Sequence, residues 1–347
     1  MKVVEPRGHA RAIERLWRSA AEGRLPHALF FEGPSGIGKG VAARWFAAGL
    51  LCAEGPGPPC GQCGPCRRVV SGGEGTNHAD LFVLDPVAEG EETIKVERIA
   101  EREGHKGPVS MLKFLNLEKL EGRWRPLLLL DAHRMTTAAQ NALLKTLEEP
   151  RPGTVLVLVT HRVDALLATI LSRVVRVRLE PLAAEDCAAL LATEGFEPAE
   201  LERLTRWAEG SPGEALRLAT TGAAEMLDVI AAALEGDASP FALARRVWEL
   251  EGAFEGEKAT ALARARARAF LHLLLAVLRD RLRVAAGVGP ESLPFGEFAR
   301  TVDERRDRAR LDAAFTALAD VERNLAAEAA LERALVAAVD PREVLRA

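Results

Sequence analysis

The sequence predicts an α/β domain built on a parallel sheet and followed by helical domains. In the first half of the chain, short apolar runs alternate with helical stretches, and the strand signals stop after Pro181. Apolar runs placed between helices are typical of strands that are buried on both faces of a parallel sheet. From about Ala223 the chain is rich in Ala, Leu, Glu and Arg, a composition that predicts helices.

The elements of the first half can be assigned in order. Helices are expected at residues 10–21, 41–51 and 137–149, and the last one must end at Pro150, which lacks an N–H donor. Strands are expected at residues 28–31, 81–84, 127–130, 155–159 and 174–179.

The second half contains only helical patterns. They are short and broken at Gly195, Gly210 and Pro212, and longer over residues 262–283 and 308–339. The chain of 347 residues has room for two or three domains. We therefore expect an α/β domain, a small helical domain and a larger helical domain, over residues 1–180, 181–221 and 222–347.

The composition limits the possible functions. Hydrophobic residues make up 48% and charged residues 28%, which indicates a folded chain. The 46 basic and 50 acidic side chains give a net charge of −4. A chain that wraps DNA by itself is usually strongly basic, so we expect any nucleic-acid role to be shared with partners. The apolar runs are far shorter than the roughly 20 residues of a membrane span. The N-terminus has no apolar core of signal-peptide length, which predicts a cytoplasmic protein.

The segment GPSGIGKG, residues 33–40, has the context of a phosphate-binding loop. It follows an expected strand and precedes an expected helix. Its glycines allow backbone N–H groups to converge on phosphate oxygens, and the lysine would reach the β- and γ-phosphates. The alternative is a glycine-rich turn that only caps a helix. The residues expected to hold phosphate are Gly33, Gly36, Gly38 and Lys39.

Two positions argue against ATP hydrolysis. Gly40 follows the lysine, where a phosphate loop has Ser or Thr to ligate Mg²⁺. Asp131 ends an apolar strand, as expected for a nucleotide site, but Ala132 follows where many ATPases have a glutamate that polarises water. We therefore expect a degenerate nucleotide site that does not hydrolyse ATP. Whether this site binds ATP and Mg²⁺ is a question that the sequence leaves open.

Four cysteines lie within 15 residues, which predicts a metal site rather than disulfides. Cys52, Cys60, Cys63 and Cys66 supply enough thiolates for a closed tetrahedral zinc site with a structural role. An iron–sulfur cluster is one alternative. In a second alternative, Cys52 is a buried apolar thiol, and the three remaining cysteines are too few for a closed metal site. The nearest spare histidine, His78, is expected to be a loop residue.

The segment TAAQNALLKTLEEP, residues 137–150, closely resembles the signature of bacterial DNA polymerase III clamp-loader subunits, which belong to the AAA+ superfamily. The resemblance covers roughly residues 5–220. It includes the segments RLPHA at 24–28, HAD at 78–80, TILSR at 169–173 and GSPGEA at 210–215, together with the four cysteines. It implies a P-loop AAA+ domain, then a small helical lid domain, then an all-α collar domain for oligomerisation.

That family contains an ATP-hydrolysing motor subunit, tau or gamma, and a delta-prime type that is not the motor. Gly40 and Ala132 favour the delta-prime type, and so does Gly213, which corresponds to an arginine that senses the γ-phosphate in the motor. The resemblance implies tau/gamma and delta subunits as partners, with the sliding clamp and primed DNA in the complex. An active tau/gamma motor and a stand-alone zinc-containing DNA-binding module are the alternatives.

The resemblance also assigns an arginine finger. The segment Ser172-Arg173-Val174 matches the family's Ser-Arg-Cys motif, in which the arginine completes the ATP site of a neighbouring subunit. The alternative is that Arg173 only forms an ion pair within its own domain. Thr160 matches the family's sensor-1 position and is expected to be a structural remnant, with His161 as a loop residue.

The signature helix is expected to pack on the sheet through one face. Its side chains at helical spacing on that face are Ala142, Leu143 and Leu147. The side chains expected to be exposed are Gln140, Asn141, Lys145, Glu148 and Glu149.

Overall fold

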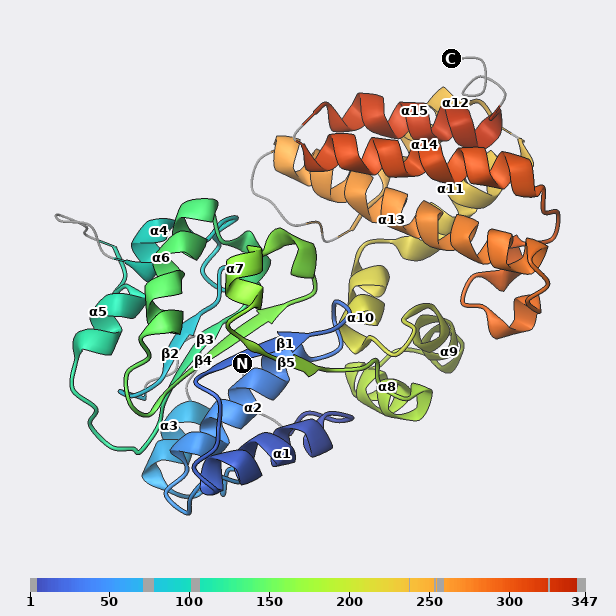
Figure 1. Cartoon of the computed structure of the whole chain (residues 1–347). Helices are drawn as coiled ribbons and strands as arrows, with labels where there is room; N and C mark the ends of the chain where they lie inside the picture. The colour runs from blue at the N-terminus through green and yellow to red at the C-terminus, as the bar shows by residue number, and fades with distance from the viewer. Residues whose placement is uncertain are drawn as a thin grey trace. The chain divides into compact units, whose positions relative to one another are not determined.

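The computed structural model describes residues 5–70, 78–100, 107–236, 238–252, 254, 259–323 and 325–341. The chain forms two compact units (Figure 1). The N-terminal unit contains residues 1–189 and 210–213, and the C-terminal unit contains residues 190–209 and 214–347. The segment 210–213 therefore packs with the N-terminal unit, although it lies between stretches of the other one.

Five parallel strands form the sheet of the N-terminal unit, in the order β2-β3-β4-β1-β5. All five predicted strands are present, with bounds that differ from the prediction by one or two residues. The strands are β1 Ala28–Glu32, β2 Phe82–Leu84, β3 Arg125–Leu129, β4 Thr154–Thr160 and β5 Val175–Arg178.

Strands β1, β3 and β4 are buried along their whole length, as their apolar runs predict. The expectation of burial on both faces is wrong for β5, one of the two edge strands of the sheet, because three of its four residues are exposed. Its Arg176 and Arg178 are largely exposed and form ion pairs with Glu32 of β1, at 3.1 and 3.6 Å.

Helices cover both faces of this sheet. Figure 1 shows α1 and α2 on one face and α4, α5 and α6 on the other. The helix expected at 10–21 is confirmed with the same bounds, and the signature helix α6 ends two residues before Pro150. The helices of this unit are α1 Ala10–Ala21, α2 Lys39–Leu51, α3 Gly64–Val70, α4 Val96–Ile99, α5 Met111–Asn116, α6 Thr137–Glu148 and α7 Ala168–Leu171.

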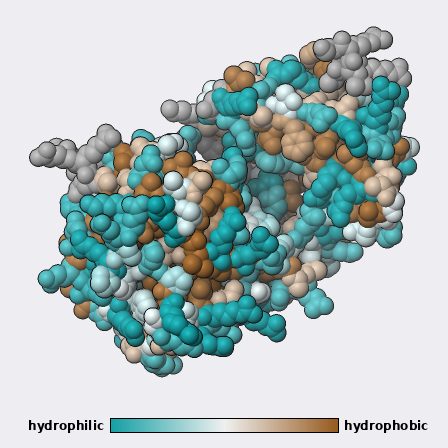
Figure 2. All heavy atoms as spheres, in the orientation of Figure 1, coloured by the Kyte–Doolittle hydropathy of each residue, from teal (hydrophilic) through white to brown (hydrophobic). Residues whose placement is uncertain are grey.

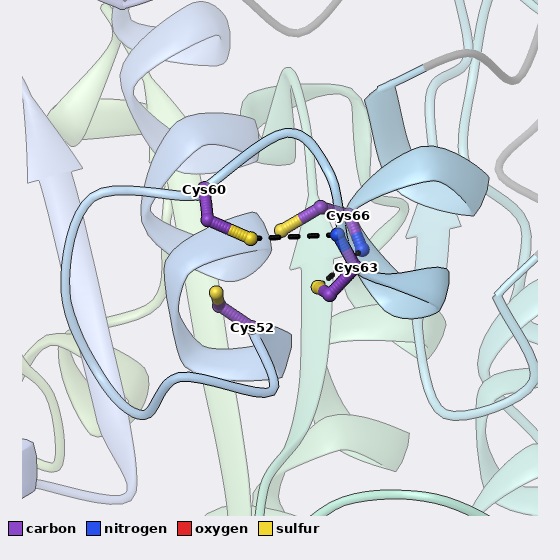
Figure 3. A group of neighbouring side chains, drawn as sticks. All are labelled: Cys52, Cys60, Cys63 and Cys66. Atoms are coloured by element: carbon purple, nitrogen blue, oxygen red, sulfur yellow. Dashed lines mark hydrogen bonds between the residues drawn. The ribbon is translucent and has the colours of Figure 1, made fainter.

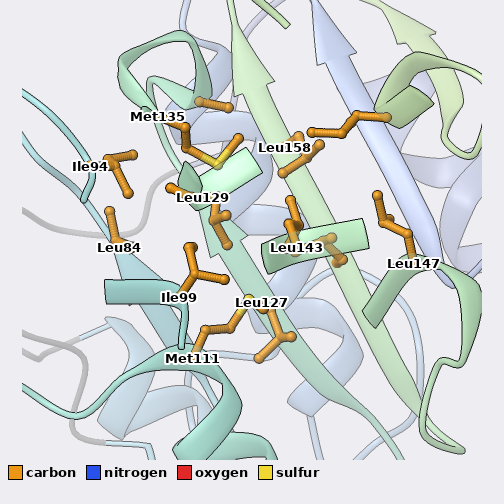
Figure 4. Close-up of a cluster of buried hydrophobic side chains, with 14 of the residues drawn as sticks. Leu84, Ile94, Ile99, Met111, Leu127, Leu129, Met135, Leu143, Leu147 and Leu158 are labelled. Carbon is orange, nitrogen blue, oxygen red and sulfur yellow. The ribbon is translucent and has the colours of Figure 1, made fainter. Parts of the chain in front are cut away.

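The core beneath α6 confirms the predicted packing face of the signature helix. Leu143 and Leu147 are buried against Leu127, Leu129 and Leu158 of the sheet (Figure 4). Helix α6 begins where Thr136 accepts a hydrogen bond from the N–H of Ala139, an N-cap that satisfies an otherwise unpaired donor. The helix is therefore fixed by its cap and by its apolar face.

The C-terminal unit is helical in the described residues. The single pattern expected over residues 308–339 is two helices, because α14 ends at Glu322 and α15 starts at Ala327. Helix α8, Ala184–Leu191, spans the boundary of the two units. The helices that follow are α9 Pro198–Trp207, α10 Pro212–Thr220, α11 Ala223–Glu235, α12 Pro240–Glu249, α13 Ala259–Ala285, α14 Glu304–Glu322 and α15 Ala327–Val339.

A buried ionic network joins α13 to α14. The carboxylate of Asp307 accepts hydrogen bonds from Arg281 at 3.0 Å and from Arg310 at 2.9 Å, and its side chain has no exposed surface. Buried charges persist when they are paired in this way. Arg281 of the arginine-rich helix α13 therefore joins it to Asp307 of α14, and Arg310 pairs with the same carboxylate from within α14.

The visible surface is largely hydrophilic (Figure 2), as expected for a chain in which 28% of the residues are charged. In Figure 2 hydrophilic residues cover most of the visible surface of each unit, with hydrophobic residues between them. Among the described residues, the helices are too short or too polar to cross a lipid bilayer.

Candidate functional site

The predicted phosphate loop lies between β1 and α2. Gly36 and Gly38 have φ angles of 72° and 92°, which L side chains rarely adopt. Gly33 has a φ of 152°, and a Cβ there would lie 2.2 Å from the carbonyl oxygen of Leu179. The glycines that the sequence singled out are therefore needed to build the loop itself.

The loop is braced from outside by hydrogen bonds to three consecutive carbonyl groups. Trans peptides carry the C=O and the following N–H on opposite sides. The N–H groups that follow these carbonyls therefore point away from the residues that donate to the loop. They stay available to bind an anion on the inner side of the loop. The three contacts are Ser211 Oγ to Ser35 O at 2.7 Å, Gly213 N to Gly36 O at 2.9 Å, and His9 Nε2 to Ile37 O at 2.7 Å.

The lysine of the loop is turned back onto the loop. Lys39 is almost fully buried, and its ammonium group donates to the carbonyl oxygen of Pro34. Burial lowers the pKa of Lys39 to about 8, against the opposing effect of Asp131. The predicted loop residues are thus together in one place, and Asp131 is close enough to act on the lysine electrostatically.

The four cysteines of the predicted metal site come together (Figure 3). Their four Sγ atoms all lie within 4.8 Å of one another. Zn–S bonds of about 2.3 Å in a tetrahedron place sulfur atoms roughly 3.8 Å apart, so this donor set fits a closed structural metal site. The N–H groups of Cys63 and Cys66 donate to Cys60 Sγ and Cys63 Sγ, each at 3.4 Å.

The local fold positions these cysteines. Cys52 caps the end of α2, and Cys66 lies in α3. A Cβ on Gly49 would lie 2.1 Å from the carbonyl oxygen of Gly57 and 2.5 Å from the ring of Trp17. This glycine therefore allows the cysteine loop to lie directly on α2. Burial raises the pKa of the Cys63 thiol, but hydrogen bonds from Ala53 and Cys66 outweigh burial and lower it to about 6.

Sequence reasoning missed a second group of potential metal ligands. Asp131, His133 and His161 each offer a ligand atom within 4.8 Å of the other two. His133 was not singled out, and His161 was expected to be only a loop residue. The signal that could have found them is their position just after two parallel strands, whose carboxyl ends lie side by side in the sheet. Partial removal of water by neighbouring groups lowers the pKa of both imidazoles, to about 4 for His133, although the His161 side chain stays exposed.

The predicted finger, Arg173, follows α7 and pairs with the signature helix. Its Nη2 lies 2.8 Å from Glu148 Oε1, and its Nη1 donates to Thr169 O at 2.9 Å. The predicted exposure of Gln140 is wrong: its buried amide accepts from Leu167 N at 2.8 Å and donates to Ala165 O at 3.0 Å. Gln140 thereby fixes the loop that leads to Arg173.

Comparison with known proteins decides the family. The family model described as "DNA polymerase III, delta subunit" matches residues 8–183. The chain belongs to this family. With the parallel sheet and the phosphate loop, this membership confirms the predicted P-loop AAA+ fold class.

Curated relatives carry two kinds of name. The chain is 38% identical to the DNA polymerase III subunit delta′ of Pseudomonas aeruginosa over 61% of this chain and 62% of that one. It is 34% identical to subunit delta′ of Bacillus subtilis over 50% and 47% of the two chains. It is also 33% identical to subunit tau/gamma of Haemophilus influenzae, over 61% and 29%. The chain thus spans about half to two thirds of the length of the delta′ relatives. The predicted resemblance to the delta-prime type is confirmed.

In this member of the DNA polymerase III delta family, the three positions that favour the delta-prime type, Gly40, Ala132 and Gly213, differ in their packing. A Cβ on Gly40 would meet only Leu130, at 3.9 Å, so packing does not require this glycine. Ala132 is fully buried in the apolar core, where a glutamate would bury a charge. A Cβ on Gly213 would lie 2.9 Å from the Cα of Gly36. Packing therefore disfavours an added side chain at Gly213, and burial disfavours a charged side chain at position 132.

We expect Gly213→Ala to destabilise this family member, because the added Cβ meets backbone atoms of the phosphate loop. Overpacking of this kind costs about 1–3 kcal/mol in the free energy of unfolding. The matched control is Gly40→Ala, which lies in a helix and has space, so the free energy of unfolding should stay equal or rise by up to about 1 kcal/mol. Chemical denaturation of both full-length variants measures the difference. Equal stability of the two variants would contradict the packing argument.

Proposed function

We propose that this chain is the non-hydrolysing, delta-prime-type subunit of a DNA polymerase III clamp loader. In this role it assists ATP-dependent loading of the sliding clamp onto primed DNA. The observation that carries the proposal is the contact of Gly213 with Gly36, where the motor type has a γ-phosphate-sensing arginine. The missing hydroxyl at Gly40 and the buried methyl group of Ala132 support it. ATP held with Mg²⁺ at Gly33, Gly36, Gly38, Lys39 and Asp131 would not be hydrolysed.

In this proposal Arg173 acts as an arginine finger in trans. Its ion pair with Glu148 is compatible with that role, because both side chains are substantially exposed, at 37% and 52%. Exposed ion pairs contribute only about 0–1 kcal/mol. A guanidinium forks onto phosphate oxygens as well as onto a carboxylate. Arg173 can therefore leave Glu148 and bind a phosphate of a neighbouring subunit at little cost in free energy.

The remaining parts of the proposal concern assembly and metal. The partners are tau/gamma and delta subunits, with the sliding clamp and primed DNA in the complex, in the cytoplasm. Residues 181–221 form a lid domain, and residues 222–347 form the collar that joins the oligomer. The metal at Cys52, Cys60, Cys63 and Cys66 is a structural Zn²⁺, which leaves no coordination position for water and so supplies no catalysis.

ATP turnover on primed DNA with the clamp tests this function. Three samples are compared: the chain alone, the motor and delta subunits without it, and the complete mixture. We expect no turnover by the chain alone and a clear stimulation in the complete mixture. Mg²⁺-dependent turnover by the chain alone would contradict the proposal and support a tau/gamma-type motor. Tight, salt-sensitive DNA binding by the chain alone would instead support a stand-alone DNA-binding module.

A further inference from the structure

The ends of two neighbouring strands bring together a second set of metal-binding side chains, apart from the four cysteines. Asp131 follows β3, His133 lies in the short 3₁₀ turn Ala132–Arg134, and His161 follows β4. Strands β3 and β4 pair in parallel, so their carboxyl ends meet at one edge of the sheet. Open α/β sheets bind ligands at this edge.

We propose that Asp131, His133 and His161 form a binding site for a divalent transition-metal ion of the Zn²⁺ class. The proposed site shares Asp131 with the nucleotide site described above, but the proposal goes beyond that function and does not rest on it. Two imidazoles and one carboxylate are ligands that suit Zn²⁺, whereas Mg²⁺ prefers oxygen ligands in octahedral geometry. The set leaves at least one coordination position open, unlike the four-cysteine site.

The distances suit such an ion. The three ligand atoms lie within 4.8 Å of one another. Zn–N and Zn–O bonds of about 2.0–2.2 Å place tetrahedral ligand atoms roughly 3.3–3.6 Å apart. Closure therefore requires a movement of about 1.5 Å or less by this estimate. His161 is exposed and follows the end of its strand, so its side chain has room to make this movement.

A hydrogen bond beside the cluster orients one ligand. The Nδ1 of His133 lies 3.0 Å from Thr160 Oγ1, which also accepts from Arg162 N at 2.9 Å. Metal-bound histidines commonly use the second ring nitrogen for such a contact, which fixes the ring and leaves the other nitrogen for the metal. The rings of His133 and His161 meet edge to face, with centroids 4.5 Å apart.

The backbone conformation of Asp131 and the nearby positive charges bear on how the site would bind a metal ion. Asp131 has a φ of 45°, a left-handed conformation that is uncommon outside glycine and that clusters at functional sites. The cations near the group are Lys39, Arg134 and Arg162, and the Nε of Arg134 lies 3.9 Å from Asp131 Oδ2. Because these cations oppose a further positive ion, we expect a dissociation constant in the micromolar range rather than the nanomolar range.

A titration of the full-length protein tests the site. The four-cysteine site is first saturated with Zn²⁺, and calorimetry then follows the binding of further Zn²⁺. We expect one more ion per chain, and at least a tenfold weaker dissociation constant in His161→Ala. His161 is exposed, so this substitution should leave the fold intact. The control is His272→Ala, which removes another exposed histidine and should not change binding.

Imidazole NMR gives a second readout. On addition of the second equivalent of Zn²⁺, the ring resonances of His133 and His161 should shift, while those of His272 stay unchanged. Mg²⁺ at the same concentration, added without ATP, should leave all three unchanged, because Mg²⁺ prefers oxygen ligands. The proposal is overturned if no second ion binds, if His161→Ala binds it as tightly as the wild type, or if Mg²⁺ shifts the same resonances.

Discussion

Arg173→Ala is expected to remove the stimulation of ATP turnover that this chain gives to the complete clamp-loader mixture. An arginine finger raises phosphoryl-transfer rates by about 10³- to 10⁵-fold, because its charge stabilises the transition state. The loss at the site that Arg173 completes should be of that order. Single-turnover measurement at limiting ATP, in the mixture with primed DNA and clamp, reports the loss.

Two matched variants separate a finger from an arginine that only holds its own domain. Arg178→Ala removes an arginine of the same unit that is 70% exposed on the edge strand, and it should keep the stimulation. Glu148→Gln removes the intrachain partner of Arg173, and it should keep or increase the stimulation, because the guanidinium is released. If Arg173→Ala and Arg178→Ala stimulate equally, the finger assignment is wrong and Arg173 serves only the contacts within its own domain, with Glu148 and with Thr169.

Cys63→Ser is expected to lose the structural metal. Protein purified without added zinc should contain about one zinc per chain, the number that one closed four-thiolate site holds. Loss of a direct ligand should weaken zinc binding by more than the roughly 10- to 100-fold cost of losing a group that only hydrogen-bonds to a ligand. Metal analysis of the two purified proteins measures this, and thermal unfolding should show a lower midpoint for the variant, because metal binding contributes to folding.

The control for this prediction is Cys187→Ser. Cys187 is buried in α8 and lies outside the group of four, so its substitution should leave the zinc content unchanged. Iron in place of zinc in the wild type would show that the cluster is an iron–sulfur site. Equal zinc in Cys63→Ser and wild type would show that Cys63 is not a ligand.

Much of the N-terminal unit could be predicted because its signals are local. The apolar runs predicted all five strands, since a short run such as Leu127-Leu128-Leu129 placed between helical stretches is typical of a strand buried on both faces. The glycines at 36 and 38 marked a loop that needs positive φ angles, and their spacing from Lys39 identified it. The four cysteines were recognisable because their spacing is short enough for one loop to gather them.

Other features depended on contacts between distant segments. Gln140 looked exposed by its place on the signature helix, but the loop at 165–167 folds over it and uses its amide. The edge position of β5 was hidden for the same reason, because Val175 and its neighbours read as a buried strand until the pairing is known. A pattern along one segment does not record which other segment covers it.

The sequence by itself determined the fold class, the phosphate loop, the cysteine group and the family, because each depends on residue types at short and fixed spacing. The tertiary structure decided three other things. It brought Gly213 against Gly36, it paired Arg173 with Glu148, and it placed His133 beside His161. The physical reason is chain topology, which brings together residues that the sequence keeps far apart. The carboxyl ends of the parallel strands β3 and β4 meet at one edge of the sheet and gather His133 and His161, whereas Glu148 and Arg173 lie ahead of the amino ends of β4 and β5.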